Sequence, residues 1–165
     1  ETFCSQACLT KINQVAATAV KAPIQPLPSP TPTKVPAVYQ TSPATKEYYV
    51  PFGSGSGSSS DWQNVPGLQA YIDSTAYGSI KSVIFEVSLH IPNANETASV
   101  RLYDATDDHP VWYSDITFSG NAQSVLLSSN PINLDTGNKL YEVQMQTQLQ
   151  YEAIIDQSRV HITTD

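Results

Sequence analysis

The sequence contains few charged residues, and this scarcity narrows the classes of protein that it can encode. Only 14% of its 165 residues are Asp, Glu, Lys or Arg, where about 25% is usual for soluble domains. The formal net charge of −7 argues against a nucleic-acid binder, because phosphate binding needs a basic surface. Few charges together with many Ser, Thr, Asn and Gln favour an extracellular or cell-surface protein.

Long hydrophobic runs and catalytic motifs are also missing. No stretch of 18 or more apolar residues occurs, so the sequence predicts no membrane span. No signal-peptide pattern occurs either, so we expect an exported protein to be present here in a mature or trimmed form. There is no GxSxG or HExxH motif, and the three histidines are scattered without a nucleophile or acid at a telling spacing. We therefore predict a protein that is not an enzyme.

Cysteine is scarce as well, and its two occurrences lie close together. Cys4 and Cys8 form a CxxxC pattern, which differs from redox CxxC motifs and from haem attachment sites, and no second Cys or His pair completes a zinc site. An oxidising compartment favours a disulfide. On a regular helix the two side chains are poorly aimed for bridging, so a bond within the chain, bonds between copies and free thiols all stay open.

The first third of the chain differs in composition from the remainder. Residues 1–20 are predicted to form a short helix that carries the two cysteines, although Ile12, Val20 and Ile24 also fit the alternation of a strand. Residues 21–46 contain seven of the 12 prolines and predict an extended arm of the polyproline II type. Neither segment can build a hydrophobic core by itself.

Residues 47–60 are predicted to be an isolated strand followed by a flexible Gly-Ser connector. Tyr48, Val50 and Phe52 share one face of that strand, and GSGSGSSS follows at residues 53–60. The connector lacks the Lys of a nucleotide-binding loop, so no nucleotide site is expected. An isolated strand can fold back onto its own domain or be lent to a neighbouring copy.

Residues 61–165 show repeated short segments of strand-like alternation and no helical stretch. Inward positions in the two clearest segments are Val83, Phe85, Val87, Leu89, Ile91, Tyr141, Val143, Met145 and Leu149. Strands are predicted at residues 68–73, 81–91, 98–102, 111–118, 123–128, 140–149 and 154–162. The sequence therefore predicts an all-β protein with a single antiparallel β-sandwich domain, similar to a jelly roll, behind a short helix and a proline-rich arm.

A resemblance adds to this prediction. The run VRLYDAT, the segment 132–134 before a Thr-Gly-Asn turn, and the run KLYEVQMQ resemble a jelly-roll module of bacterial exported and surface-anchored proteins. Carbohydrate-binding modules and extracellular filament subunits share this style of strand lengths and turns. The resemblance covers residues 68–162 and implies a fold, but it assigns no functional residue.

Three groups of residues are candidates for binding. Asp104, Asp107 and Asp108 lie in one loop and offer oxygen ligands to Ca²⁺, although their spacing does not match an EF-hand loop and an ordinary solvated turn is the favoured interpretation. Asn95 begins an Asn-Glu-Thr glycosylation sequon on a predicted turn. Five aromatic residues are candidates for a platform that binds sugar rings. Strand alternation places the adjacent Trp112 and Tyr113 on opposite faces, so we expect at most one of these two to be exposed. The five candidates are Trp62, Tyr77, Tyr103, Trp112 and Tyr113.

Charge is distributed unevenly along the chain. Residues 1–46 contain four Lys and one Glu, a net charge of +3, whereas residues 47–165 contain four basic and fourteen acidic residues, a net charge of −10. This contrast favours contact between the arm of one copy and the body of another. We predict a structural subunit of an extracellular filament or surface assembly, joined head to tail. Its assembly arm comprises Ile12, Val20, Ile24, Tyr48, Val50 and Phe52. The alternative is a carbohydrate-binding or adhesive module on a stalk.

Overall fold

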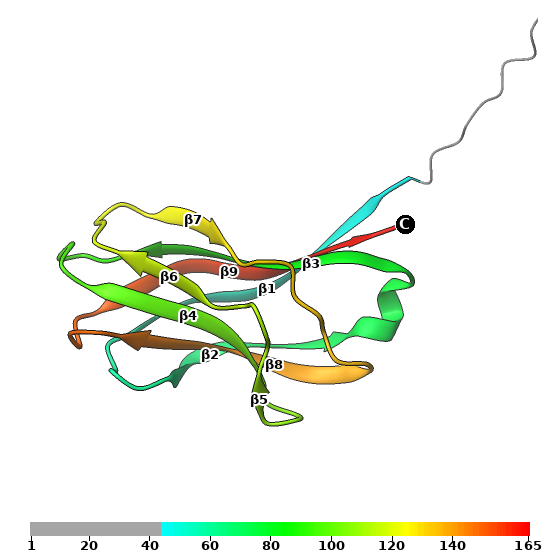
Figure 1. Ribbon diagram of the computed structural model, residues 1–165, viewed down its shortest axis with the longest axis horizontal. Coiled ribbons are helices and arrows are strands. Elements are labelled where there is room, and N and C mark those ends of the chain that lie inside the picture. Colours follow the sequence, from blue (N-terminus) through cyan, green and yellow to red (C-terminus); the bar gives the residue numbers. More distant parts are fainter. Residues whose placement is uncertain (1–43) are drawn as a thin grey trace, which may run out of the picture. The chain divides into compact units, whose positions relative to one another are not determined.

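The computed structural model describes residues 44–165, which form a β-sandwich of two antiparallel sheets (Figure 1). The predicted helix, Cys4, Cys8 and the arm residues Ile12, Val20 and Ile24 lie outside the described residues. Among residues 44–165, no helix is both long and apolar enough to span a membrane. The predicted all-β sandwich is confirmed.

One sheet has the strand order β1-β9-β3-β7. The other has the order β2-β8-β4-β5, and β6 also pairs with β4. A 3-10 helix of four residues, Ser74–Tyr77, follows β2. The strands are β1 Lys46–Gly57, β2 Gln63–Asp73, β3 Ile80–His90, β4 Thr97–Asp104, β5 His109–Pro110, β6 Ile116–Ser119, β7 Val125–Ser128, β8 Asn138–Thr147 and β9 Ala153–Thr164.

The core lies between the sheets and follows the predicted alternation. In β3 the residues Phe85, Val87 and Leu89 have no exposed surface, and Tyr141 and Val143 of β8 are equally buried. Because successive side chains of a strand point to opposite faces, each strand contributes every second residue to this layer. The predicted inward positions of both segments are confirmed, with one exception at Leu149.

Leu149 was predicted to point inward, but its side chain is 58% exposed. The reason is that β8 ends at Thr147, so Leu149 belongs to the turn before β9. Gln150 in that turn has a positive φ of 59°, which ends the alternation. Backbone N–H groups of the turn bind the carboxylate of Glu96 instead of a neighbouring strand.

Strand β1 is part of the sandwich of its own chain. It pairs with β9 from Lys46 opposite Thr164 to Gly57 opposite Ala153. Phe52 is only 6% exposed and belongs to the core, Val50 packs against that core, and Tyr48 stays 38% exposed. The prediction of an isolated strand is therefore wrong, and this strand completes its own domain.

The prediction of a flexible connector is wrong for residues 53–57, because β1 continues to Gly57, and residues 58–60 connect β1 with β2. The glycines serve close packing here. A Cβ at Gly55 would lie 2.6 Å from Cγ1 of Val65, and one at Gly57 would lie 3.2 Å from Sδ of Met145. Only a residue without a side chain lets β1 pass this close to the opposite sheet.

Candidate functional site

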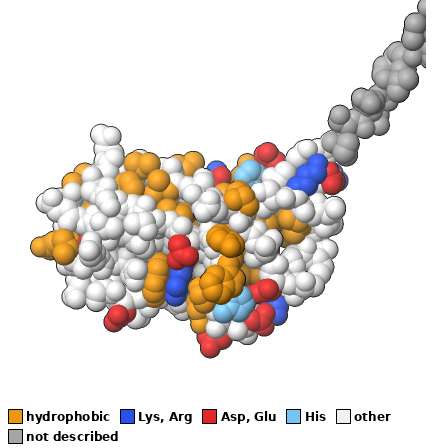
Figure 2. All heavy atoms as spheres, in the orientation of Figure 1, with side chains coloured by type: hydrophobic (Ala, Val, Ile, Leu, Met, Phe, Trp, Pro, Cys, Tyr) orange, Lys and Arg blue, Asp and Glu red, His pale blue; other side chains and the backbone are white. Residues whose placement is uncertain are grey.

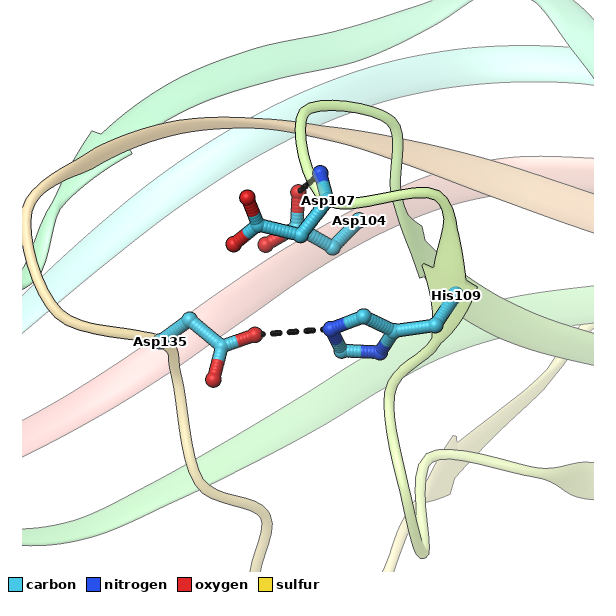
Figure 3. Close-up of side chains that lie close together, drawn as sticks. All are labelled: Asp104, Asp107, His109 and Asp135. Atoms are coloured by element: carbon cyan, nitrogen blue, oxygen red, sulfur yellow. Dashed lines mark hydrogen bonds and ion pairs between the residues drawn. The ribbon is translucent and has the colours of Figure 1, made fainter.

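Three acidic residues and one histidine come together where β4 ends. Asp104 is the last residue of β4, Asp107 follows in the next turn, and His109 begins β5 (Figure 3). Asp135 comes from the segment between β7 and β8. One ligand atom from each of these four residues lies within 4.8 Å of the others. We call this group the acidic cluster.

Asp104 forms the buried side of the acidic cluster. Its side chain has no exposed surface, and Oδ1 accepts hydrogen bonds from the backbone N–H groups of Thr106 at 2.8 Å and Asp107 at 3.1 Å. These bonds fix the turn that brings Asp107 back over Asp104. Oδ2 is equally buried and has no hydrogen-bond partner among the described residues.

The phenol of Tyr141 lies close to the Asp104 carboxylate. Burial is the largest cause that raises the pKa of Tyr141, and the charges of Asp104 and Asp135 raise it further. Its hydroxyl oxygen accepts the backbone N–H of Asp135 at 3.0 Å. A side-chain hydrogen-bond interaction with Asp104 also raises the pKa of Tyr141, so its hydroxyl lies beside that carboxylate. Oδ2 nevertheless has no partner within 3.5 Å at hydrogen-bonding geometry among the described residues.

His109 and Asp135 form the outer side of the acidic cluster. Nε2 of His109 lies 2.9 Å from Oδ2 of Asp135, and Nδ1 lies 3.1 Å from the carbonyl oxygen of Pro110. Because a carbonyl oxygen only accepts, the Nδ1 atom carries the proton. The bond to Pro110, above all, and the negative charge of Asp135 raise the pKa of His109, although partial burial acts in the opposite direction.

Lys139 partly balances the negative charge. Its Nζ atom lies 2.6 Å from Oδ2 of Asp107, and this hydrogen bond raises the pKa of Lys139. Asp108 does not belong to the cluster, because its carboxylate accepts the hydroxyl of Tyr103.

Of the three carboxylates considered for Ca²⁺, the structure brings Asp104 and Asp107 together and leaves Asp108 aside. Sequence reasoning missed His109 and Asp135. The position of His109 directly after the acidic run was an available signal, whereas nothing in the sequence connected Asp135 with this loop. Binding of Ca²⁺ here stays a prediction.

A pocket opens beside the acidic cluster. It has a volume of about 330 Å³ and is lined by His109, Val111, Trp112, Tyr113, Asn133 and Asp135. On the face drawn in Figure 2, hydrophobic side chains lie directly beside a histidine and a group of acidic side chains, in the region where Figure 1 places β5. His109 and Asp135 belong to the acidic cluster and also line the pocket, so the cluster and the pocket share a wall.

Both aromatic residues of the pocket are exposed. Trp112 is 76% and Tyr113 is 67% exposed, so the prediction that only one of them is exposed is wrong. The cause is a turn, because the predicted strand 111–118 is interrupted between β5 and β6 and Tyr113 has a φ of 69°. The buried hydroxyl of Ser114 accepts the N–H of Leu102 at 3.0 Å and donates to the carbonyl of Val111 at 2.7 Å, which holds the turn in place.

The other candidate aromatics do not extend this surface into one platform. The guanidinium of Arg101 lies 4.1 Å from the ring centroid of Trp62, and the ring of Tyr77 packs edge to face on Tyr48 at 5.1 Å. Tyr103 is held by its hydrogen bond to Asp108. Of the five candidate aromatics, Trp112 and Tyr113 line this pocket and remain exposed.

Two further sequence predictions concern single residues. Asn95 is exposed in the turn between β3 and β4, as expected for a sequon, and its glycosylation stays a prediction. His90 and His161 do have acidic partners in the fold: Nδ1 of His90 lies 2.8 Å from Asp156, and Nδ1 of His161 lies 3.7 Å from Glu86.

Comparison with known proteins gives likenesses of fold only. No family model and no curated protein sequence matches this chain. Solved structures that resemble it include the CBM36-1 domain of a multidomain xylanase from the hindgut metagenome of Trinervitermes trinervoides, with 16% identity, a TM-score of 0.46 and coverage of 71% of this chain and 96% of that domain. Another is the VP2 subviral particle of infectious bursal disease virus, with 12% identity, a TM-score of 0.41 and coverage of 83% of this chain and 37% of that one. Both TM-scores lie below 0.5, so these likenesses carry no argument about the function of this chain.

Proposed function

We propose that the described domain is a non-catalytic carbohydrate-binding module whose ligand occupies the pocket at Trp112 and Tyr113. The observation that carries this proposal is the exposure of two adjacent aromatic side chains, 76% and 67%, at the wall of a pocket. Single exposed apolar residues are ordinary on protein surfaces, whereas a rigid aromatic pair beside polar groups marks a binding site.

The chemistry of the pocket suits a sugar. A sugar ring has apolar C–H faces that pack on aromatic rings, and a rim of hydroxyl groups that must keep hydrogen bonds when it is bound. Trp112 and Tyr113 supply the aromatic surface, and Asn133, Asp135 and His109 supply acceptors and donors at the edge. The volume of about 330 Å³ is at the small end of ligand sites, which favours a short stretch of a glycan chain.

Hydrogen bonds hold the aromatic wall of the pocket in place without a ligand. The hydroxyl of Ser114 anchors the turn that holds both aromatics outward. A binding surface that is already ordered loses less conformational entropy when it binds, which favours affinity. An extracellular or cell-surface location, where free polysaccharides occur, follows from this proposal.

The proposal is tested by removing each aromatic side chain. Trp112→Ala and Tyr113→Ala should each weaken binding to the polysaccharide that the unmodified protein retains, by about tenfold or more. Binding is measured by affinity electrophoresis across a panel of soluble polysaccharides and then by isothermal titration calorimetry. Tyr71→Ala is the matched control, because Tyr71 is an aromatic of β2 that is 68% exposed and does not line the pocket.

The melting temperature should stay nearly unchanged in all three variants, since exposed side chains contribute little to stability. If the panel contains no ligand, or if Tyr71→Ala weakens binding as much as Trp112→Ala, the pocket is not a glycan site.

Self-assembly through the N-terminal arm is a second candidate function. The net charge of +3 on residues 1–46 against −10 on residues 47–165 favours it. Strand donation by Tyr48, Val50 and Phe52 has lost its basis, because β1 already pairs with β9 of the same chain. The outer edge of β1 is a poor template for another strand, since Pro51 donates no hydrogen bond and the register shifts at Gly53.

The assembly proposal therefore depends on residues 12–24, including Ile12, Val20 and Ile24, and on disulfides of Cys4 and Cys8 between copies. Size-exclusion chromatography and negative-stain imaging of the full chain, compared with a chain that lacks residues 1–43, test it. Filaments that persist without residues 1–43 would exclude the arm as the cause of assembly.

A further inference from the structure

We propose that Asp104, Asp107, His109 and Asp135 form a binding site for a divalent transition-metal ion such as Zn²⁺ or Mn²⁺. The inference goes beyond glycan binding and does not depend on it.

The donor atoms are already near the positions that an ion needs. Zn²⁺ binds imidazole nitrogen and carboxylate oxygen at about 2.1 Å in tetrahedral geometry, so its ligand atoms are about 3.4 Å apart. One ligand atom from each of the four residues lies within 4.8 Å of the others. Side-chain rotations that bring the most distant ligand atoms closer by roughly an ångström would close the site.

Asp104 gives an independent reason to expect a cation. The residue is completely buried, and its Oδ2 atom has no hydrogen-bond partner in the described part of the chain. Buried polar atoms in native proteins nearly always have a partner, and a bound ion or water is one explanation for a buried oxygen without one. In Figure 3 this oxygen points away from the backbone bond of Oδ1, to the side on which the Asp107 and Asp135 carboxylates lie.

His109 is oriented as a metal ligand. Nδ1–H donates to the carbonyl of Pro110, which leaves the lone pair of Nε2 directed at the Asp135 carboxylate 2.9 Å away. Histidines that bind metals commonly donate the other ring N–H to a backbone carbonyl or a carboxylate, because that bond fixes the tautomer and the ring. Without a proton on Nε2, this nitrogen and Oδ2 of Asp135 are both electron-pair donors. They repel each other unless a proton or a metal ion lies between them.

The acidic cluster has a net negative charge that a bound cation can balance. Asp104, Asp107 and Asp135 contribute three formal negative charges and Lys139 contributes one positive charge, so two negative charges remain around a neutral His109. Lys139 binds Oδ2 of Asp107 and leaves Oδ1 of that carboxylate available. A divalent ion would therefore neutralise the cluster.

The imidazole decides the class of ion. Ca²⁺ takes oxygen ligands almost without exception, and the sequence-based expectation of Ca²⁺ considered only the carboxylates of Asp104, Asp107 and Asp108. One nitrogen and three carboxylate oxygens suit Zn²⁺ or Mn²⁺ better. Because two ligands sit on an exposed rim, with His109 40% and Asp135 47% exposed at the side chain, the ion can enter and leave from solvent.

The experiment uses the full chain with Cys4→Ser and Cys8→Ser, so that thiols do not bind the added metal. The protein is stripped with a chelator and titrated with Zn²⁺, Mn²⁺ and Ca²⁺ by isothermal titration calorimetry, and the metal content is measured by mass spectrometry. We expect one Zn²⁺ or Mn²⁺ per chain, tighter than Ca²⁺, and a higher melting temperature with the bound ion.

Substitutions of cluster residues test whether the ion binds at the acidic cluster. Asp135→Asn and His109→Gln change partly exposed residues, so both should fold, and each should weaken metal binding by about 100-fold, since even the loss of an outer partner costs 10–100-fold. Asp108→Asn is the matched control, because Asp108 lies in the same loop outside the cluster and should keep full affinity. Trp112→Ala should also keep it, which separates this proposal from glycan binding.

Three results would overturn the assignment. They are the absence of Zn²⁺ and Mn²⁺ binding at millimolar concentration, unchanged affinity in Asp135→Asn, and a preference for Ca²⁺ over both transition metals.

Discussion

Oε2 of Glu96 accepts the backbone N–H of Tyr151 at 2.9 Å and thereby ties the turn between β3 and β4 to the turn between β8 and β9. The carboxylate of Glu96 also accepts the N–H groups of Thr97, Gln148 and Leu149. Glu96 is only 3% exposed, so these backbone groups replace water around a buried charge. A single side chain thus accepts four backbone N–H groups, three of which belong to the turn after β8.

Glu96→Gln should lower the free energy of unfolding by about 2–3 kcal/mol, because an amide replaces a charged acceptor and turns an N–H₂ group toward backbone donors. Urea unfolding followed by fluorescence measures the change. Glu152→Gln is the control, since Glu152 is exposed in the same turn and should leave stability unchanged. Equal stability of Glu96→Gln and the unmodified protein would mean that the bonds to the turn contribute nothing.

The same residue predicts a dependence on pH. Burial alone would raise the pKa of Glu96, but the four backbone N–H groups outweigh burial and lower it. Because the folded-state pKa lies below the unfolded value, the stabilisation is complete above about pH 4.3 and is lost as the pH falls through the folded pKa. The stability difference between the unmodified protein and Glu96→Gln should therefore be constant near pH 7 and shrink below about pH 4. A difference that grows on acidification would contradict the lowered pKa.

Gly55→Ala should destabilise the domain by about 1–3 kcal/mol, because the added methyl group would meet Val65 at 2.6 Å and Leu68 at 3.0 Å. Thermal unfolding measures the effect. Ser54→Ala, at the exposed neighbouring position, is the control. Combining Gly55→Ala with Val65→Ala should recover part of the loss, because the second change makes room for the first. Strictly additive losses would show that the two residues do not compete for space.

Phe52→Ala should lower the free energy of unfolding by about 3 kcal/mol, since Phe52 is 6% exposed in the core of its own chain. The melting temperature of this variant should not depend on protein concentration, because β1 pairs within the chain. Tyr48→Ala is the control at a position that is 38% exposed. A melting temperature that rises with concentration would show that β1 is exchanged between copies.

Ser114→Ala should lower both the stability of the domain and its affinity for the glycan. The variant leaves the buried N–H of Leu102 without a partner, which costs about 1–3 kcal/mol. It also loosens the turn that holds Trp112 and Tyr113, so glycan affinity should fall although neither aromatic is changed. Calorimetric titration and thermal unfolding measure the two effects. Ser128→Ala, at an exposed position of β7, should alter neither of them.

The strands were predictable where apolar and polar residues alternate without interruption. In β3, Phe85 and Val87 face the core while Ser82 and Ser88 face outward, and that pattern alone specifies a half-buried strand. Gly-rich residues 53–57 carry no such pattern, because their contribution to packing is the absence of side chains. Composition indicates flexibility there, whereas the register with β9 shows a strand.

The binding residues were predictable only in part, because they depend on turns and on contacts between distant segments. Alternation placed Trp112 and Tyr113 on opposite faces, and the turn fixed by Ser114 brings both to the surface. Asp104 and Asp107 share one loop and could be grouped from the sequence. Asp135 reaches them only through the packing of the segment before β8, which no local pattern encodes.

The pairing of Lys46 with Thr164 places the chain's entry into the sandwich directly beside its exit. In Figure 1 the start of β1 and the C-terminal end of β9 lie next to each other. Domains with adjacent ends tolerate insertion into other proteins and circular permutation. We therefore expect this sandwich to tolerate insertion into a loop of another protein. A pulling force applied between Lys46 and Thr164 would separate β1 from β9 one residue pair at a time.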